Sequence, residues 1–236
     1  MTEFKLGKLP PKFDPRTFKL SAYFKAGLPP VPWFCGWHIK GRDWGYLGND
    51  KYGDCAFAAV GHAEQCWTAN SFKQLDVKEK DIIDAYFAYT GGEDRGSVLL
   101  DVLKIWRKQG IINKKIEAFV KVDRVEQVKS AIYMFGGVYI GLELPNYVMK
   151  SPIKTPWTRT AFAAPNSNNG HCVHVVGYDK NNLYCITWGQ VKAMSYNFAK
   201  KYMDEAYVIL SPDWFYEQKA PNGFDYRALQ EDLGRV

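Results

Sequence analysis

The sequence predicts an α+β protein in which a helical lobe is followed by a lobe built from an antiparallel β-sheet or barrel. Helical patterns lie between residues 54 and 110, and most alternating, strand-like patterns follow residue 115. The chain has 236 residues, of which 47% are hydrophobic and 24% are charged, so it is long enough for two closely joined lobes of ordinary globular composition. We expect a cleft between the lobes, where functional sites commonly lie.

Residues 1–48 are predicted to form an extended N-terminal arm. This segment is rich in proline and tryptophan. Proline does not fit the interior of a helix or of a central strand, so regular structure is not expected here. The aromatic side chains are expected to pack the arm onto the body of the protein.

Three helices are predicted within residues 49–115. The first, at 54–70, is rich in alanine, and Asp54 can cap its first turn. Asp76 and Glu79 have the spacing of a capping box at the start of the second helix. The third has one apolar face at positions 99, 102, 103 and 106, and glycines follow the second and third helices.

Residues 116–210 are predicted to form the sheet lobe. Alternating or apolar runs predict strands at 116–122, 138–144, 171–178, 183–188 and 204–210. We also expect a helix at 123–137 with Asp123 and Glu126 as its capping box, an irregular loop at 145–170, and a short helix or turn at 192–203. Residues 211–236 are predicted to form a polar C-terminal extension with a last helix around 225–233.

Charge and hydropathy narrow the class of function. The net charge is +6, but lysine and arginine are spread along the chain rather than concentrated on one element, so nucleic-acid binding is not expected. No apolar run is long enough to span a bilayer, and the N-terminal sequence lacks the apolar core of a signal peptide. We therefore expect a cytoplasmic protein without a membrane partner.

The cysteines and histidines are few, so they limit the possible chemistry. Five cysteines without a secretion signal predict free thiols rather than a disulfide framework. Cys55 lies in the predicted first turn of a helix, where the helix dipole lowers the pKa of a thiol. Cys35 and His38 form half of a zinc-binding pattern with no second half, so neither a metal nor a cofactor is expected.

One histidine fits the role of a general base for Cys55. His62 lies too far along the same helix as Cys55, and His174 is expected to be interior. His171 follows Gly170 at the start of a predicted strand, beside a loop, where its imidazole can be reached. Such a base needs an orienting acceptor, and Thr187 lies in the next predicted strand.

An oxyanion that forms beside Cys55 would also need hydrogen-bond donors. Asn49 lies six residues before Cys55 and can offer a side-chain amide, together with the backbone N–H of Cys55 itself. The order along the chain is therefore amide donor, cysteine at a helix start, helical lobe, Gly-His strand and acceptor strand. This order is typical of a cysteine hydrolase with its site in a cleft.

Several stretches of the chain resemble the papain-like cysteine peptidases. The sequence YGDCAFAAV at 52–60 is similar to the helix start around that family's nucleophile, and GHCVHVVGYD at 170–179 is similar to its histidine strand. Residues 91–111 resemble its glycine-rich turn and helix, and 125–144 its helix–glycine–strand unit. Residues 9–16 are similar to its mature N-terminal segment, so we interpret the arm as permanent. Phage-encoded and bacterial proteins also carry chains of this kind.

The resemblance implies a role for each matching position. Cys55 would be the nucleophile of an acyl-enzyme mechanism on peptide or isopeptide bonds, His171 the acid and base, and Asn49 the oxyanion donor. Thr187 would be the acceptor for the histidine, and Trp188 would shield the hydrogen bond between them. The supporting positions beside the pair are Gly53, Asp54 and Gly170.

The sequence departs from the family pattern at three positions. Asn49 stands where the family has glutamine, Thr187 where it has asparagine, and Ala56 where it has an aromatic residue. These departures leave a second hypothesis open, in which the fold serves as a binding or structural module with little or no catalysis. Its partner would then be a virion or host protein, and the protein would be associated with a phage particle.

A third hypothesis is a cell-wall amidase or endopeptidase of the CHAP type. That type also places a cysteine before a Gly-His strand, but the two residues lie much closer in sequence than Cys55 and His171 do here. A peptide or protein is therefore the expected substrate. The sequence does not predict which peptides are cut.

Overall fold

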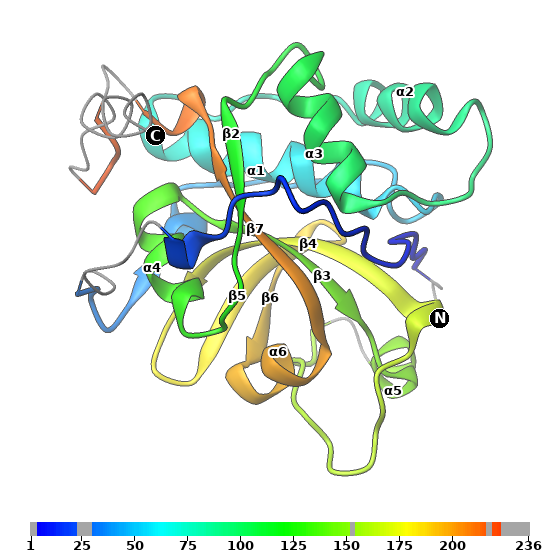
Figure 1. Ribbon diagram of the computed structural model, residues 1–236, viewed down its shortest axis with the longest axis vertical. Coiled ribbons are helices and arrows are strands. Elements are labelled where there is room, and N and C mark those ends of the chain that lie inside the picture. Colours follow the sequence, from blue (N-terminus) through cyan, green and yellow to red (C-terminus); the bar gives the residue numbers. More distant parts are fainter. Residues whose placement is uncertain (1–3, 23–29, 152–153, 216–218, 223–236) are drawn as a thin grey trace.

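The computed structural model describes residues 4–22, 30–151, 154–215 and 219–222, and it confirms the predicted α+β class (Figure 1). Three helices form a layer on one side, and the strands of a twisted antiparallel sheet form the other side. The N-terminal segment, dark blue in Figure 1, runs between these two parts. The predicted order, helices first and most strands later, is therefore correct.

Helix α1 (Cys55–Ser71) is the central helix of the helical lobe, and nearly all of its side chains are buried. It packs against the sheet through strand β4 (Gly170–Tyr178) and against the other helices through Trp67, whose ring stacks on that of Trp106. The Tyr139 hydroxyl donates a hydrogen bond to the Ala56 carbonyl at 2.9 Å. This hydrogen bond fixes the first turn of α1 to the sheet.

Helices α2 (Glu79–Thr90) and α3 (Leu99–Lys108) complete this layer. The predicted capping box of α2 is wrong, because Lys78 occupies the N-cap position and Asp76 pairs with the Lys78 ammonium group instead. Gly91 ends α2 in the left-handed conformation, with φ at 75°, which a glycine adopts without strain. The apolar face predicted for α3 is buried.

The sheet has seven strands in the described part of the chain, and all its neighbouring strands are antiparallel. The strand order is β2-β7-β3-β4-β5-β6, and the two-residue strand β1 (Cys35–Gly36) pairs with β4. The remaining strands are β2 (Ala118–Lys121), β3 (Val138–Glu143), β5 (Asn182–Thr187), β6 (Gln190–Ser195) and β7 (Met203–Leu210). Strand β4 lies in the middle, so it carries the predicted histidine into the core.

Three predicted elements differ from the structure. The segment 192–203 is half strand, because β6 ends at Ser195 and the short helix α6 (Tyr196–Tyr202) starts only there. Helix α4 (Gln127–Phe135) starts later than predicted, since the Gln127 side chain rather than a capping box accepts from the backbone ahead of it. The predicted loop at 145–170 contains helix α5 (Asn146–Lys150), and the helix predicted at 225–233 lies outside the described residues.

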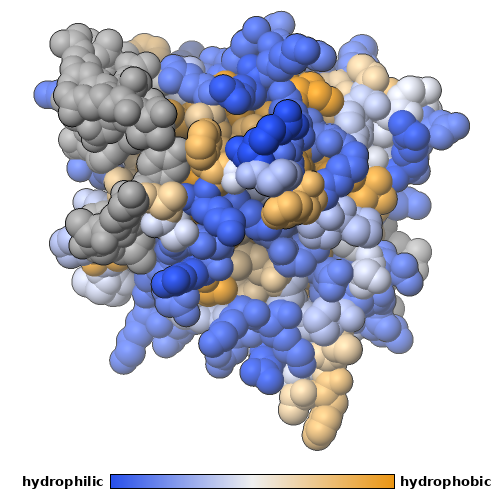
Figure 2. Space-filling model, viewed as in Figure 1, coloured by the Kyte–Doolittle hydropathy of each residue, from blue (hydrophilic) through white to orange (hydrophobic). Residues whose placement is uncertain are grey.

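The surface seen in Figure 2 is largely hydrophilic, with small separate hydrophobic areas. No helix among the described residues is both long and apolar enough to cross a membrane. The apolar side chains are instead gathered in one large core that joins the helices to the sheet.

His174 is a buried histidine whose charge state couples the fold to pH. It is fully buried on β4 and packs edge-on against Trp67, and this burial lowers its pKa to about 3. Because the unfolded chain takes up a proton near pH 6.5, the stability from this group is present above that pH and is lost as pH falls toward the folded pKa. Between about pH 6.5 and 4.5, the free energy of unfolding measured in urea should fall by about 2–3 kcal/mol more for the native protein than for His174→Met. Parallel curves for the two proteins would contradict this origin.

Candidate active site

Cys55 lies at the first position of α1, where the helix meets β4. The backbone N–H of Cys172 donates a hydrogen bond to its sulfur at 3.3 Å. Since His171 directly precedes Cys172 in the chain, this contact places the start of β4 beside the predicted nucleophile. The helical lobe supplies the thiol, and the sheet supplies the imidazole.

His171 is held by its neighbours on the sheet. Its Nε2 lies 2.8 Å from the Thr187 hydroxyl, which is the predicted acceptor, and the Trp188 ring stacks on the imidazole with centroids 4.6 Å apart. Nδ1 has no hydrogen-bond partner among the described residues. When Nε2–H donates to Thr187, Nδ1 is left as a free acceptor for a proton.

Thr187→Val removes the acceptor while it preserves the volume of the side chain. We expect peptide hydrolysis by this variant to fall about 10- to 100-fold, because the imidazole loses the bond that fixes its tautomer and orientation. Thr187→Ser keeps a hydroxyl and should retain most of the activity. Comparison of kcat for the two variants on one peptide tests the prediction, and an equal loss in both would show that the hydroxyl has no orienting role.

The aromatic shield around His171 is larger than the sequence predicted. Trp157 packs edge-on against the imidazole with centroids 6.3 Å apart, and Phe4 stacks on the outer face of Trp188 at 4.7 Å. Trp188 itself has a positive φ of 48°, which non-glycine residues rarely adopt, so its ring is placed at a local cost. Phe4 and Trp157 could not be predicted as neighbours of His171, because only the abundance of aromatic residues points to them.

Asn49 is nearly fully buried close to the start of α1. Its side-chain Nδ2 donates to the backbone carbonyls of Tyr52 at 3.1 Å and Lys5 at 3.3 Å. The carbonyl of Lys5 is a peptide carbonyl from the N-terminal segment, bound by the amide that the sequence predicts as an oxyanion donor. The Asn49 amide thus donates to a peptide carbonyl of the N-terminal segment.

Residues 5–9, which we call the cleft segment, lie across Cys55 between the two lobes. The Gly7 and Lys8 N–H groups both donate to the Gly170 carbonyl, at 3.2 and 3.0 Å. On the other side, Ser97 N–H donates to the Gly7 carbonyl at 2.7 Å, and Leu9 N–H donates to the Ser97 carbonyl at 2.9 Å. The cleft segment is thus bound in the cleft as an extended peptide would be.

Gly7 permits this close approach. A Cβ on Gly7 would lie 1.8 Å from the carbonyl oxygen of Gly53, and a Cβ on Gly170 would lie 2.0 Å from the Lys8 carbonyl oxygen. Gly53 and Gly170, which are predicted as supporting residues, therefore lie directly against the cleft segment. Gly53 is fixed in turn by its N–H, which donates to the Asp94 carboxylate at 2.8 Å.

In the covered site the pKa shifts favour a neutral thiol and a neutral imidazole, whereas the position of Cys55 at the helix start predicts a lowered thiol pKa. Burial raises the pKa of the Cys55 thiol to about 11, although the Cys172 and Gly7 N–H groups act in the opposite direction. Burial also lowers the pKa of His171 to about 3. His171 was expected to be reachable, but it is fully buried here beneath its aromatic neighbours. Desolvation outweighs the helix dipole as long as the cleft is covered.

Asp54 lies at the predicted N-cap position but does not act as predicted. It occupies the N-cap position of α1, but its side chain makes no capping hydrogen bond. The carboxyl group is fully buried, and burial raises its pKa to about 8. It lies beside Cys55 and adds unfavourable charge to a thiolate when it is ionised.

Cys172 takes part in the site through its backbone N–H, whereas the side chains of His62, Cys66 and Cys185 make no hydrogen bond to Cys55 or His171 within the described residues. His62 Nε2 lies 3.0 Å from the Gly45 carbonyl oxygen, and Cys66 and Cys185 are fully buried. No cluster of three or more His, Cys, Asp or Glu side chains suited to a metal ion occurs among the described residues. The described site therefore offers a thiol, an imidazole and amide donors.

Comparison with solved structures identifies the fold. Xylellain, a cysteine protease from Xylella fastidiosa, aligns with a TM-score of 0.65 and 17% identity over 89% of this chain and 97% of its own. The digestive procathepsin L 3 of Tenebrio molitor larval midgut aligns at 0.63 and 11% identity, over 89% of this chain and 76% of its own. The cysteine protease CMS1MS2 of Carica candamarcensis aligns at 0.53 and 15% identity, over 77% and 99%.

No family model and no curated protein matches the sequence of this chain. The likeness is therefore one of structure, and it extends over most of the chain and over most of each protein compared. This chain has the fold of the papain-like cysteine proteases.

Proposed function

We propose that this protein is a cysteine peptidase that cleaves peptide or isopeptide bonds through an acyl-enzyme on Cys55. The observation that carries the proposal is the junction of α1 with β4, where the N–H of Cys172, the residue after His171, donates to the Cys55 sulfur, and where His171 is bound to Thr187. The fold, which is that of cysteine proteases, supports the same chemistry.

The first half of the reaction forms the acyl-enzyme. His171 Nδ1 takes the proton of the Cys55 thiol, and the sulfur attacks the carbonyl carbon of the bound peptide. The carbonyl oxygen becomes an oxyanion, which accepts hydrogen bonds from Asn49 Nδ2 and from the Cys55 backbone N–H. The His171 imidazolium then gives its proton to the departing amine, and the C–N bond breaks.

The second half returns the enzyme to its starting state. Water gives a proton to His171 Nδ1 and attacks the thioester carbonyl carbon. The tetrahedral intermediate collapses, the C–S bond breaks and the sulfur recovers the proton from the imidazolium. Thr187 accepts from Nε2–H throughout, so Nδ1 stays directed toward the sulfur.

The cleft segment supports the peptide as substrate class. It shows that an extended backbone fits over Cys55, with hydrogen bonds to Ser97 on one side and Gly170 on the other. Its Lys5 carbonyl is bound by Asn49. A substrate needs this space, so hydrolysis requires the cleft segment to leave.

One observation favours a binding module as a second candidate function. Cys55 and His171 make no hydrogen bond to each other, and the pKa values of about 11 and about 3 describe a neutral pair. A protein that never uncovers this pair would only bind a partner.

The two functions are separated by digestion of an unfolded protein substrate. The native chain, a variant with the cleft segment displaced and Cys55→Ser are compared. The peptidase proposal expects cleavage that increases on displacement and disappears with Cys55→Ser. Absence of Cys55-dependent cleavage in the displaced variant would contradict it.

A further inference from the structure

The side chain of Lys8 is buried in a pocket between two carboxyl groups. Its ammonium nitrogen lies 2.6 Å from Asp204 Oδ2 and 3.6 Å from Glu205 Oε1, and only 1% of the side chain is exposed. It also donates to the Leu9 carbonyl at 3.2 Å. A buried lysine without partners would be costly, so the two carboxyl groups on β7 are what allow this side chain to enter.

The pocket keeps unused acceptors. Tyr207 donates its hydroxyl hydrogen to Glu205 Oε2 at 2.9 Å, which fixes that side chain. Glu205 Oε1 and Asp204 Oδ1 are buried and accept no hydrogen bond from the described residues, and Glu205 as a whole is 97% buried, with 3% exposure. A guanidinium group has more donors than an ammonium group and would find acceptors here.

The backbone of the sheet makes room for this long side chain. A Cβ on Gly141 of β3 would lie 2.2 Å from Lys8 Cε and 2.8 Å from Asp204 Oδ1. Any larger residue at this position would fill the channel through which the lysine side chain reaches the carboxyl groups. The pocket therefore combines charge and shape for a long basic side chain.

The lysine that fills the pocket belongs to the cleft segment, which covers the candidate nucleophile. Lys8 follows Gly7 in the chain. The backbone N–H of Gly7 and the positive charge of Lys8 both act to lower the pKa of the Cys55 thiol. Its main chain is held by Gly170 and lies beside Ser97. A substrate backbone held by the same groups would direct one of its side chains into this pocket.

We propose that the Asp204–Glu205 pocket is the specificity pocket of the cleft and selects substrates with a lysine or arginine side chain at the position that enters it. The inference rests on the proposed function, since it assigns the substrate class of the same site. Lys8 occupies the pocket in the covered state and stands in for that substrate side chain.

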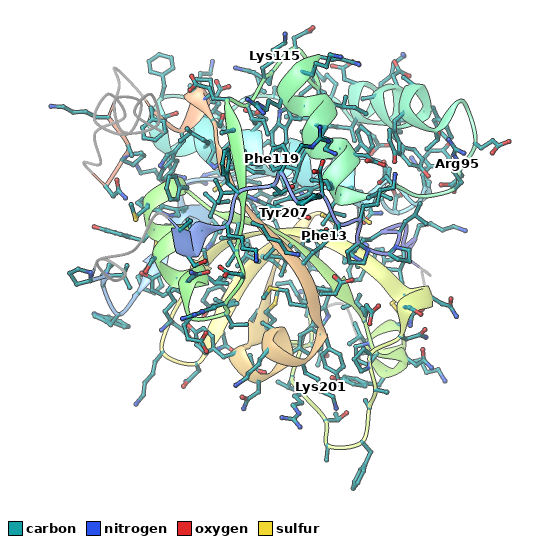
Figure 3. All side chains as sticks on the ribbon, in the orientation of Figure 1. Phe13, Arg95, Lys115, Phe119, Lys201 and Tyr207 are labelled. Carbon is teal, nitrogen blue, oxygen red and sulfur yellow. The ribbon has the colours of Figure 1, made fainter. Side chains whose placement is uncertain are left out.

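The outer rim of the pocket leads to a surface cavity. This cavity, about 540 Å³ in volume, is bordered by Asp204, Glu205 and Tyr207 and by Phe13 of the arm. Figure 3 shows Phe13 and Tyr207 close together on this face, between the helices and the sheet. The carboxyl groups therefore lie between the cleft and the solvent.

The test uses the full-length chain with Gly7→Val and Lys8→Ala, which displaces the cleft segment and empties the pocket. Fluorogenic peptides carry lysine or norleucine at one position at a time, so that each pair differs only in the amine. We expect lysine to raise kcat/KM at least about 10-fold at one position, as a buried charged hydrogen bond would. Asp204→Asn with Glu205→Gln should bring this ratio close to one, whereas the exposed control Asp84→Asn should leave the ratio unchanged. Equal rates for both peptides at every position, or a preference that survives the double substitution, would overturn the proposal.

A binding measurement separates this proposal from the proposed function. In a Cys55→Ser background, calorimetry compares the same lysine and norleucine peptides without any turnover. If no peptide is cleaved but lysine still binds at least about 10-fold more tightly, and Glu205→Gln removes the difference, the pocket assignment stands and the peptidase proposal fails. If peptides are cleaved and bound without any lysine preference, the pocket assignment fails and the peptidase proposal stands.

Discussion

Gly7→Val is expected to raise both peptide hydrolysis and the alkylation rate of Cys55 by about 30-fold or more. The new side chain would collide with the Gly53 carbonyl, because even a Cβ would lie 1.8 Å from that oxygen. The segment is held by four backbone hydrogen bonds, which together contribute roughly 2–6 kcal/mol. Their loss should lower the ratio of covered to uncovered sites by about 30-fold or more. Displacement of the segment uncovers Cys55 and removes the burial that raises its pKa.

The matched control is Phe13→Val, which changes an exposed residue of the same arm outside the cleft. Its alkylation rate should equal that of the native chain. Rates are measured with iodoacetamide at about pH 7.5, below the reference pKa of about 8.5 for a free thiol, and each modified cysteine is located by mass spectrometry. Equal labelling of Cys55 in Gly7→Val and the native chain, with unchanged circular dichroism, would show that the segment does not restrict access.

Cys55→Ser and His171→Ala should each abolish hydrolysis in the Gly7→Val background, with a fall in kcat of about 10⁴-fold or more. The two residues act as a unit, so the double substitution should cost little more than either one alone. A control substitution is Cys35→Ala, which removes a buried thiol on β1, away from the site. Losses that add independently, or activity that persists in Cys55→Ser, would assign the reaction to other residues.

Much of the site could be predicted from the sequence because its signals are local. The start of α1 at Cys55 follows from alanine content and a preceding polar residue, and the β4 strand follows from a short run of apolar residues after Gly170. Pairing of His171 with Thr187 required only that consecutive strands be neighbours in the sheet, which is common.

The cleft segment could not be predicted, because it depends on contacts between distant parts of the chain. Its path is decided by the close approach of Gly7 to Gly53 and by the burial of Lys8, and neither leaves a pattern in the sequence around it. The raised thiol pKa of Cys55 was missed for the same reason, since it is a consequence of this covering.

The predicted element boundaries are wrong where a strand and a helix share one spacing of buried residues. Met194, Phe198 and Tyr202 are spaced by four and indicate a helix, yet Met194 belongs to β6 and only the other two lie in α6. All three are buried, so the spacing reflects a shared core rather than one element.

The most direct test of the account is the pH dependence of Cys55 alkylation in Gly7→Val, with and without His171→Ala. The account predicts an apparent thiol pKa well below about 8.5 in Gly7→Val, because the uncovered imidazole accepts the proton and stabilises the thiolate. In the double variant the apparent pKa should return to about 8.5 or above. A Cys55 that stays inert, or that titrates in the same way whether or not His171 is present, would contradict the catalytic pair.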